Sequence, residues 1–326
     1  MTLFELFFIL LHTKKYCFMS YVLLIVGFVL LTFAADWLVN GASGLAKRLN
    51  VSELVIGLTI VAFGTSAPEL VVNVVATAKG TTDIALTNVL GSNIFNVLII
   101  LGISVLVYPI ACQKNTFRYE IPLSVLAGAI VLLLAQDGNL QGFDGAILLA
   151  IFVGFLVYAV SQAKKNVSND AEESTQSMKI WKAILLVIVG LGGLVVGGNL
   201  IVDNAVVIAK SWGLSEAVIG VTIVAAGTSL PELATSVVAA LKKNTDLAIG
   251  NVIGSNIFNV FFILGLSSSI SSLPIYDNFV VDASLAAGSS LLLLLFVALS
   301  RKRELNRWTG IIMLGCFLTY VFWLLK

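Results

Sequence analysis

Long apolar segments separated by short polar ones run along the chain from Met19 to its end. A helix needs about 20 consecutive apolar residues to cross a bilayer, and ten such segments can be drawn. The predicted spans are 21–45, 54–78, 84–110, 121–135, 145–162, 183–209, 217–241, 247–270, 280–299 and 309–325. The pattern therefore predicts an all-α polytopic membrane protein with ten transmembrane helices.

Two segments depart from this pattern. The stretch before Met19 contains one short apolar run followed by Lys14 and Lys15, and it is too short to span. We interpret residues 1–18 as an N-terminal extension upstream of a functional start at Met19, with a weak signal-like segment as the alternative. Residues 163–180 form the one long polar linker, so the chain divides into a first five-helix repeat, 19–162, and a second, 181–326.

Two polar motifs occur twice within the apolar segments. GTSAPE at 64–69 and GSNIFN at 91–96 return as GTSLPE at 227–232 and GSNIFN at 254–259, in each case 163 positions later. The register holds without a gap over 36–104 against 199–267. Because each half has five spans, an odd number, the second copy must cross the membrane in the opposite direction to the first. Inverted repeats of this kind are typical of transporters whose substrate site lies near the bilayer midplane.

Composition supports a membrane protein and excludes several classes. Hydrophobic residues make up 59% of the chain and charged residues 11%, with a mean hydropathy of +1.02. The net charge is +1 and there is no dense basic stretch, so nucleic-acid binding is not expected. Cys17, Cys112 and Cys316 have no metal-ligand spacing. His12 is the only histidine, which argues against a Ser/His enzyme or a His-ligated metal, and we expect no enzymatic activity.

Orientation follows from the distribution of positive charge. Most of the 19 Lys and Arg residues fall on one side of the predicted spans, including Lys47, Arg118 and Arg301. The positive-inside rule places that side in the cytoplasm. We therefore expect a protein of the cell (plasma or inner) membrane with both termini outside and the 163–180 linker inside.

Each repeat places one glutamate near the centre of an apolar span. Ionised Glu69 or Glu232 would cost on the order of 2.5–3.5 kcal/mol there, and the two would repel each other if the repeats bring them close. A bound cation would remove both penalties. Protonation of the two glutamates is the alternative, and it would suit proton coupling.

Helical spacing assembles further oxygen donors around these carboxylates. Two faces with the spacing i, i+3, i+4, i+7 carry Ala62, Thr65, Ser66 and Glu69, and Ala225, Thr228, Ser229 and Glu232. Two stripes with the spacing i, i+4, i+8 carry Asn88, Ser92 and Asn96, and Asn251, Ser255 and Asn259. Pro68 and Pro231 lack an N–H and so release a backbone carbonyl. Carboxylate, hydroxyl, amide and carbonyl oxygens suit Ca2+ or Na+ rather than Zn2+ or Cu+.

Plainer explanations compete at several positions. Ser and Thr in membrane helices often bond to their own backbone, and glycines such as Gly64 and Gly227 often serve helix packing. Asp36 and Asn40 correspond to Asn199 and Asp203, and either a gate or simple solvation explains them. We expect Asp282, like three other acids near the outer face, to be a solvated loop charge.

The duplicated GTS-x-PE and GSNIFN motifs resemble the two alpha repeats of the calcium/cation antiporter superfamily, most of all those of prokaryotic sodium/calcium exchangers. The resemblance extends over all ten predicted spans. It implies two inverted five-helix repeats that exchange Na+ for Ca2+ by alternating access, with Glu69 and Glu232 as the central Ca2+ ligands. It adds as ligands the side chains of Thr65, Ser66, Ser92, Asn96, Thr228, Ser229 and Ser255 and the carbonyls of Ala62 and Ala225.

Asn259 departs from the pattern of many relatives, which carry an aspartate at this position. The predicted site keeps the amide of Asn259 but has only two carboxylates, whose charge one Ca2+ or two Na+ would balance. If the family aspartate acts while protonated, asparagine replaces it with little change. If it acts while charged, stoichiometry or ion choice differs here.

The leading hypothesis is a secondary active antiporter that exchanges Na+ for Ca2+, with these ions and the lipid bilayer as its partners and no cofactor. A Ca2+/H+ or other cation/H+ antiporter is the alternative, distinguished by transport that follows a pH gradient without Na+. A cation channel is a further rival, which would conduct passively without a counter-ion. The sequence predicts no particular oligomeric state.

Overall fold

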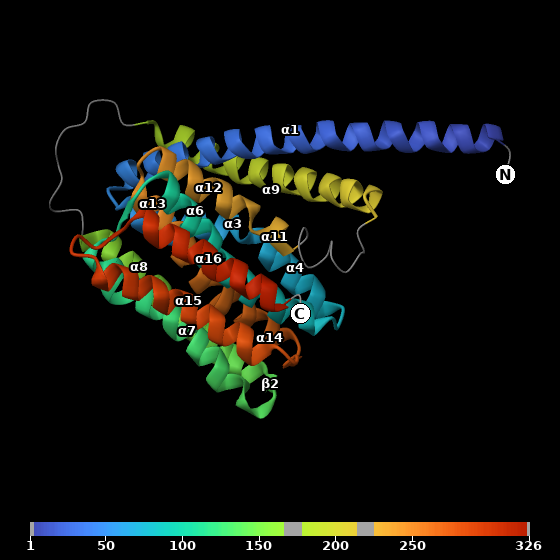
Figure 1. Cartoon of the computed structure of the whole chain (residues 1–326). Helices are drawn as coiled ribbons and strands as arrows, with labels where there is room; N and C mark the ends of the chain where they lie inside the picture. Colours follow the sequence, from blue (N-terminus) through green and yellow to red (C-terminus); the bar gives the residue numbers. More distant parts are fainter. Residues whose placement is uncertain (1–2, 166–177, 214–224, 325–326) are drawn as a thin grey trace.

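The computed structural model describes residues 3–165, 178–213 and 225–324, and it is almost entirely helical (Figure 1). Helices α1 (Leu3–Leu49) and α9 (Ile180–Ser211) lie side by side along one flank of the bundle (Figure 1). Glycines bring their backbones together. A Cβ on Gly190 would lie 2.7 Å from the Leu38 nitrogen, so a larger side chain would push the two helices apart.

The second span is broken. It consists of α2 (Glu53–Ile56), a π-helical segment η1 (Gly57–Val61), α3 (Ala62–Thr65) and α4 (Ala67–Ala78). Its two parts meet at an angle of 46°. In the second half, α11 (Ala225–Thr228) is followed by α12 (Leu230–Leu241) with a similar interruption, and the earlier part of the predicted span 217–241 lies outside the described residues.

Two spans occupy the centre of the bundle. One comprises α5 (Thr82–Phe95), η2 (Asn96–Leu101) and α6 (Gly102–Val107), and the other α13 (Thr245–Ile257), η7 (Phe258–Leu264) and α14 (Gly265–Ile270). The most apolar windows of these two spans are 72% and 94% buried, compared with 39% or less in the other described spans that run without a break. Both change from α- to π-helical geometry at the end of GSNIFN, and π-helical turns are frequent at functional sites.

The remaining helices cover this centre. They are η3 (Thr116–Glu120) with α7 (Ile121–Leu134) and η4 (Ala135–Asp137), then α8 (Gly142–Lys165), α15 (Phe279–Leu299) and α16 (Arg307–Leu324). Short antiparallel ladders join loops of the two halves: β1 (Ile110–Ala111) pairs with β4 (Glu304–Leu305), and β2 (Asn139–Leu140) with β3 (Leu273–Pro274).

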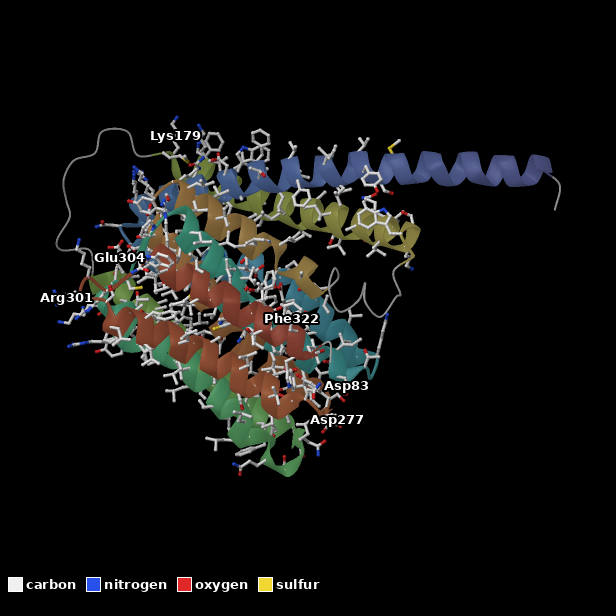
Figure 2. All side chains as sticks on the ribbon, viewed as in Figure 1. Asp83, Lys179, Asp277, Arg301, Glu304 and Phe322 are labelled. Atoms are coloured by element: carbon white, nitrogen blue, oxygen red, sulfur yellow. The ribbon has the colours of Figure 1, made fainter. Side chains whose placement is uncertain are left out.

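Side chains show the arrangement of a membrane protein. Figure 2 places Lys179, Arg301 and Glu304 at one end of the bundle and Asp83 and Asp277 at the other. Between these ends the outer helices expose large apolar side chains, such as those of α9 and α15. Apolar side chains between two charged ends are the surface that a bilayer requires.

The predicted spans agree closely with these helices. Among the described residues, eight helices are long and apolar enough to cross a membrane, and the bent pair Glu53–Thr65 and Ala67–Ala78 makes a ninth. The prediction for the first span was too short, because 21–45 is part of a continuous 47-residue helix that begins at Leu3. The chain is thus a mostly helical, polytopic membrane protein.

Candidate cation site

Both GTS-x-PE motifs form helix breaks. Ser66 leaves helical geometry, with φ −83° and ψ 10°, and α4 begins at the next residue with Pro68 in its first turn. Ser229 has φ −89° and ψ 6°, and Pro231 lies in the first turn of α12. Proline cannot donate the hydrogen bond that would continue the preceding helix. Each motif therefore starts a new helix in the interior of the bundle.

The two glutamates lie in the first turns of these new helices. Glu69 belongs to α4 and Glu232 to α12, and each is only 1% exposed. The positive end of a helix dipole favours a carboxylate at this position. Like charges in one buried region repel each other. The fold thus places two carboxyl groups, which carry like charges when ionised, in one buried region.

Hydrogen bonds from the helix breaks cross between the halves. Ser66 Oγ donates to Glu232 Oε1 at 2.8 Å, and Ser229 Oγ donates to Glu69 Oε1 at 3.1 Å. Each serine therefore fixes the carboxylate of the opposite repeat. This exchange joins residues that are 166 and 160 positions apart in the chain.

Several buried oxygens near these crossed hydrogen bonds have no hydrogen-bond partner among the described residues. They include the second carboxylate oxygen, Oε2, of both Glu69 and Glu232. Oδ1 of Asn96 and of Asn259, and Oγ of Ser255, are also unpartnered and buried. Unpaired buried oxygens are costly. A cation bound among them would supply the missing interaction.

Four asparagines form a second set of reciprocal hydrogen bonds between the halves. Asn96 Nδ2 donates to Asn256 Oδ1 at 3.0 Å, and Asn259 Nδ2 donates to Asn93 Oδ1 at 3.1 Å. Asn93 and Asn256 in turn donate to each other's main-chain carbonyls, at 3.1 and 3.2 Å. Because the amide nitrogens of Asn96 and Asn259 are engaged in this way, their free oxygens are held in one orientation.

Thr65 belongs to a polar cluster on the α12 side of the site. Its Oγ1 donates to Asn251 Oδ1 at 3.1 Å. Asn251 Nδ2 donates to Ser236 Oγ at 2.9 Å and to the main-chain oxygen of Glu232 at 3.3 Å. The hydroxyl of Thr65 is thereby held beside the carboxylate of Glu232.

The remaining predicted hydroxyls also gather around the glutamates. Ser229 Oγ lies 3.3 Å from Ser92 Oγ. Thr228 lies beside Glu69, and Ser255 lies beside Glu232. The side chains predicted from motif spacing thus converge on the two carboxylates.

The backbone positions differ from this set. The Ala62 carbonyl accepts a hydrogen bond from Ser66 N at 3.0 Å, and Thr65 Oγ1 lies 3.3 Å from it. A carbonyl oxygen has two lone pairs, so this helical hydrogen bond leaves one of them for an ion. Ala225, the corresponding backbone position, is the first residue of α11. Among the side chains of the predicted stripes, Asn88 has an amide nitrogen without a partner among the described residues.

Asn93 and Asn256 were not among the predicted site residues. Helical spacing places them off the polar stripes of their spans, and their role depends on contacts between segments about one repeat apart. The signal for them was the identical asparagine in the centre of both GSNIFN copies.

The interpretation of Asp282 as a solvated charge is wrong. Asp282 is 7% exposed and accepts hydrogen bonds from Tyr276 at 2.5 Å and Tyr320 at 2.9 Å. Two phenol hydroxyls replace water around its carboxylate. The first half has a similar pair, since Tyr158 donates to Glu120 at 2.5 Å, and 38 residues separate acid and tyrosine in both.

In the described part of the chain, no three or more His, Cys, Asp or Glu side chains form a group that could hold a metal ion. A cavity of about 400 Å³ does lie beside the first helix break, but its lining is almost wholly apolar and includes neither glutamate. Two carboxylates with neutral oxygens remain as the ion-binding chemistry.

Fold and site together define a polytopic membrane protein with a buried, oxygen-lined carboxylate pair between two repeats. The chain belongs to the sodium/calcium exchanger protein family, whose model matches residues 19–161 and 182–326.

Individual relatives agree with this assignment. The chain is 40% identical to the putative antiporter CaxA of Alkalimonas amylolytica, over 92% of this chain and 96% of the relative. It is 29% identical to the sodium/calcium exchanger MaX1 of Methanosarcina acetivorans, over 93% and 97%. Its structure is similar to that of the sodium-calcium exchanger NCX_Mj soaked with Na+ and Sr2+, with a TM-score of 0.82 and 35% identity over 94% of this chain and 98% of that one.

Proposed function

We propose that this chain is a secondary active antiporter that exchanges Na+ for Ca2+ across a membrane by alternating access. The observation that carries the proposal is the pair of buried glutamates, one from each half, whose free Oε2 atoms lie among other unpartnered oxygens. Membership of the sodium/calcium exchanger family and the similarity to NCX_Mj support it. The protein forms and breaks no covalent bond in this proposal and needs no cofactor.

Charge balance supplies the coupling. Glu69 and Glu232 carry two negative charges when ionised, and one Ca2+ or two Na+ neutralise them. An empty site with two negative charges is costly in the membrane interior. The protein therefore changes the face to which the site is open only when ions are bound. Because both ions need the same carboxylates, binding of Na+ displaces Ca2+ and the reverse.

The ligands fall into two groups by the contacts they make. Glu69 and Glu232 bind the ions directly, and the free oxygens of Asn96, Asn259 and Ser255 are neutral ligands. The hydroxyls that bond to the carboxylates or lie beside them turn toward the ions when these enter. This second group consists of Thr65, Ser66, Ser92, Thr228 and Ser229. The carbonyls of Ala62 and Ala225 complete the proposed ligand set.

The neutral side chain at position 259 fits this arrangement. Asn93 donates its amide nitrogen to the Asn256 carbonyl, so its Oδ1 faces position 259 and needs a donor. Asn259 supplies one. A protonated aspartate would also do so, but an ionised one would place two acceptors against each other. The hydrogen bonds therefore favour the hypothesis in which residue 259 acts without charge.

Ten spans arranged as two inverted repeats, 19–162 and 181–326, complete the proposal. The crossed bonds between Ser66 and Glu232 and between Ser229 and Glu69 support it, because each half contributes the same contact to the other. Residues 1–18 are an extension, and the 163–180 linker lies in the cytoplasm. Both termini lie on the outer, non-cytoplasmic side of the cell (plasma or inner) membrane. Separation of Arg301 and Asp277 to opposite ends supports this topology (Figure 2).

Radiolabelled Ca2+ uptake into proteoliposomes tests the exchange. Vesicles loaded with Na+ and diluted into Na+-free medium should accumulate Ca2+, whereas vesicles loaded with K+ at the same pH should not. Uptake driven by a pH gradient without Na+ would instead support the Ca2+/H+ alternative. Passive flux that needs no counter-ion would support a channel.

A further inference from the structure

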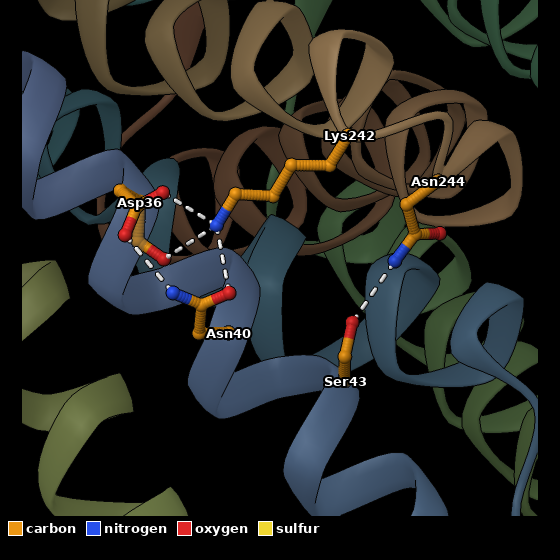
Figure 3. Close-up of polar contacts among 5 residues, drawn as sticks. All are labelled: Asp36, Asn40, Ser43, Lys242 and Asn244. Carbon is orange, nitrogen blue, oxygen red and sulfur yellow. Dashed lines mark hydrogen bonds and ion pairs between the residues drawn. The ribbon is translucent and has the colours of Figure 1, made fainter.

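An ion pair joins helix α1 to the turn that follows α12. Lys242 Nζ lies 2.5 Å from Asp36 Oδ1 and donates to Asn40 Oδ1 at 2.7 Å (Figure 3). Asn40 Nδ2 donates back to Asp36 Oδ2 at 2.9 Å. Asn244 adds a hydrogen bond to Ser43 at 3.0 Å in the same region (Figure 3). We call the group Asp36, Asn40 and Lys242 the α1 latch.

The same charged groups recur in the other half of the chain. At an offset of 163 positions, Asp36 and Asn40 correspond to Asn199 and Asp203 on α9, and Lys242 corresponds to Lys79 at the end of α4. Acid and amide have exchanged places, but one carboxylate and one ammonium remain. We call the group Lys79, Asn199 and Asp203 the α9 latch.

The two latches are in different states. The α1 latch is closed, whereas the side chains of Lys79 and Asp203 are exposed and have no hydrogen-bond or ion-pair partner among the described residues. Helix packing shows the same difference. Helix α1 packs along α12, and no comparable packing of α9 on α4 exists in the described ranges.

A buried cluster repeats this asymmetry independently. Asn251 is bonded to Ser236 on the α12 side of the site, at 2.9 Å. Its counterparts at the same offset are Asn88 and Asn73 on the α4 side. The amide nitrogen of Asn88 and both polar atoms of Asn73 have no partner among the described residues. Polar contacts and helix packing therefore close the α12 side of the site, whereas the corresponding contacts on the α4 side are not formed.

We propose that the two groups are alternating latches of the transport cycle. The α1 latch holds the α12 side closed in the state seen here. When α1 and α9 move relative to the rest, the α1 latch opens and Lys79 pairs with Asp203 to close the α4 side. The proposal rests on alternating-access exchange, the function proposed above, and it assigns to these residues a role in setting the balance between the two states.

The exposure of the α1 latch suits this role. The Lys242 and Asp36 side chains are 30% and 42% exposed, so solvent weakens their attraction. An ion pair of this kind changes an equilibrium by about two- to five-fold. A much stronger pair would hold the carrier in one state.

Transport kinetics on the two membrane faces test the latches. Asp36→Asn and Lys242→Gln should each raise the KM for Ca2+ about two- to five-fold on the face that is open in the present state, and lower it on the opposite face. Asp203→Asn and Lys79→Gln should do the reverse. The exchange Asp36→Lys with Lys242→Asp should restore the KM ratio of the wild type. Equal changes on both faces, or no recovery in the charge exchange, would overturn the proposal.

Cysteine cross-linking, which does not depend on transport, tests the latches separately from the proposed Na+/Ca2+ exchange. In full-length protein with Cys17, Cys112 and Cys316 replaced by alanine, one cysteine pair is placed at positions 36 and 242 and another at 79 and 203. The two cross-links should exclude each other within one molecule. Both forming in the same molecule, or none forming at 79 and 203 in Na+, in Ca2+ or without either ion, would contradict the latch. Absence of Na+-dependent Ca2+ uptake in wild-type protein would overturn only the proposed exchange.

Discussion

Asn93 and Asn256 each donate their side-chain amide to the other's main-chain carbonyl, at 3.1 and 3.2 Å. They are the same residue of the two GSNIFN copies, so the contact relates one repeat to the other. Their remaining oxygens hold the amide nitrogens of Asn259 and Asn96. The pair thus orients the neutral ligands of the candidate site while lying one layer behind them.

Removing this support should weaken ion binding. Residues that orient a metal ligand typically contribute 10- to 100-fold to affinity. We therefore expect Asn93→Ala and Asn256→Ala each to lower Ca2+ affinity by roughly 10- to 100-fold, measured by equilibrium binding to purified protein. Asn278→Ala, at an exposed position, is the matched control. Wild-type affinity in Asn93→Ala would show that the amide oxygens need no such orientation.

Both glutamates should be essential for exchange. With only one carboxylate, a bound Ca2+ would keep one unbalanced positive charge in the buried site, and an unpaired buried charge costs about 3–5 kcal/mol. Glu69→Gln and Glu232→Gln should therefore reduce Na+-dependent Ca2+ uptake by more than about 100-fold while the protein still inserts and remains monodisperse. Asp277→Asn, which removes an exposed carboxylate, should leave uptake unchanged. Wild-type flux in either glutamine variant would contradict the site.

Asn259→Asp should make transport depend on pH. Asn93 Oδ1 needs a donor at position 259, and an aspartate donates only while it is protonated. Uptake by this variant should approach that of the wild type at low pH and fall as pH rises and the new carboxyl ionises. The wild type, measured in parallel, corrects for the titration of other groups. An Asn259→Asp profile parallel to that of the wild type would contradict the requirement for a donor.

Two tyrosine–carboxylate pairs should stabilise the fold rather than bind ions. Tyr158 donates to the buried carboxylate of Glu120, whose other oxygen has no partner among the described residues. Tyr158→Phe should lower the free energy of unfolding by about 1–3 kcal/mol, because a buried acceptor loses its donor. Tyr320→Phe should have a smaller effect, since Tyr276 still donates to Asp282.

Thermal unfolding in detergent measures these effects, with Tyr21→Phe as the control at an exposed position. A Tyr158→Phe variant as stable as the wild type would show that Glu120 finds another donor. Loss of Ca2+ binding without loss of stability would place Glu120 in the transport pathway.

Much of the fold could be predicted from the sequence because its physical cause is local. Apolar length sets the spans, and nearly all predicted boundaries lie within a few residues of the helices. Pro68 and Pro231 marked the two helix breaks, since a missing N–H acts on its own turn. The hydroxyls of the two GTS-x-PE motifs could be selected because helical spacing places them on the same face as a glutamate. The other serines and the amides could be selected because they line one polar stripe of an otherwise apolar span.

What the sequence could not predict depends on contacts between distant segments. The orientation of Asn259 is set by Asn93, 166 residues away. Asp282 resembled a solvated acid because the tyrosine donor Tyr320 lies 38 residues further along.

Competition between the two ions at equilibrium tests the central claim most directly. Ca2+ binding to purified wild-type protein should be measured by calorimetry over a series of Na+ concentrations at constant ionic strength. If one Ca2+ and two Na+ share the carboxylates of Glu69 and Glu232, the apparent dissociation constant for Ca2+ should rise with the second power of the Na+ concentration. A Ca2+ affinity independent of Na+ would contradict a shared site, and a third-power dependence would contradict the charge balance proposed for it.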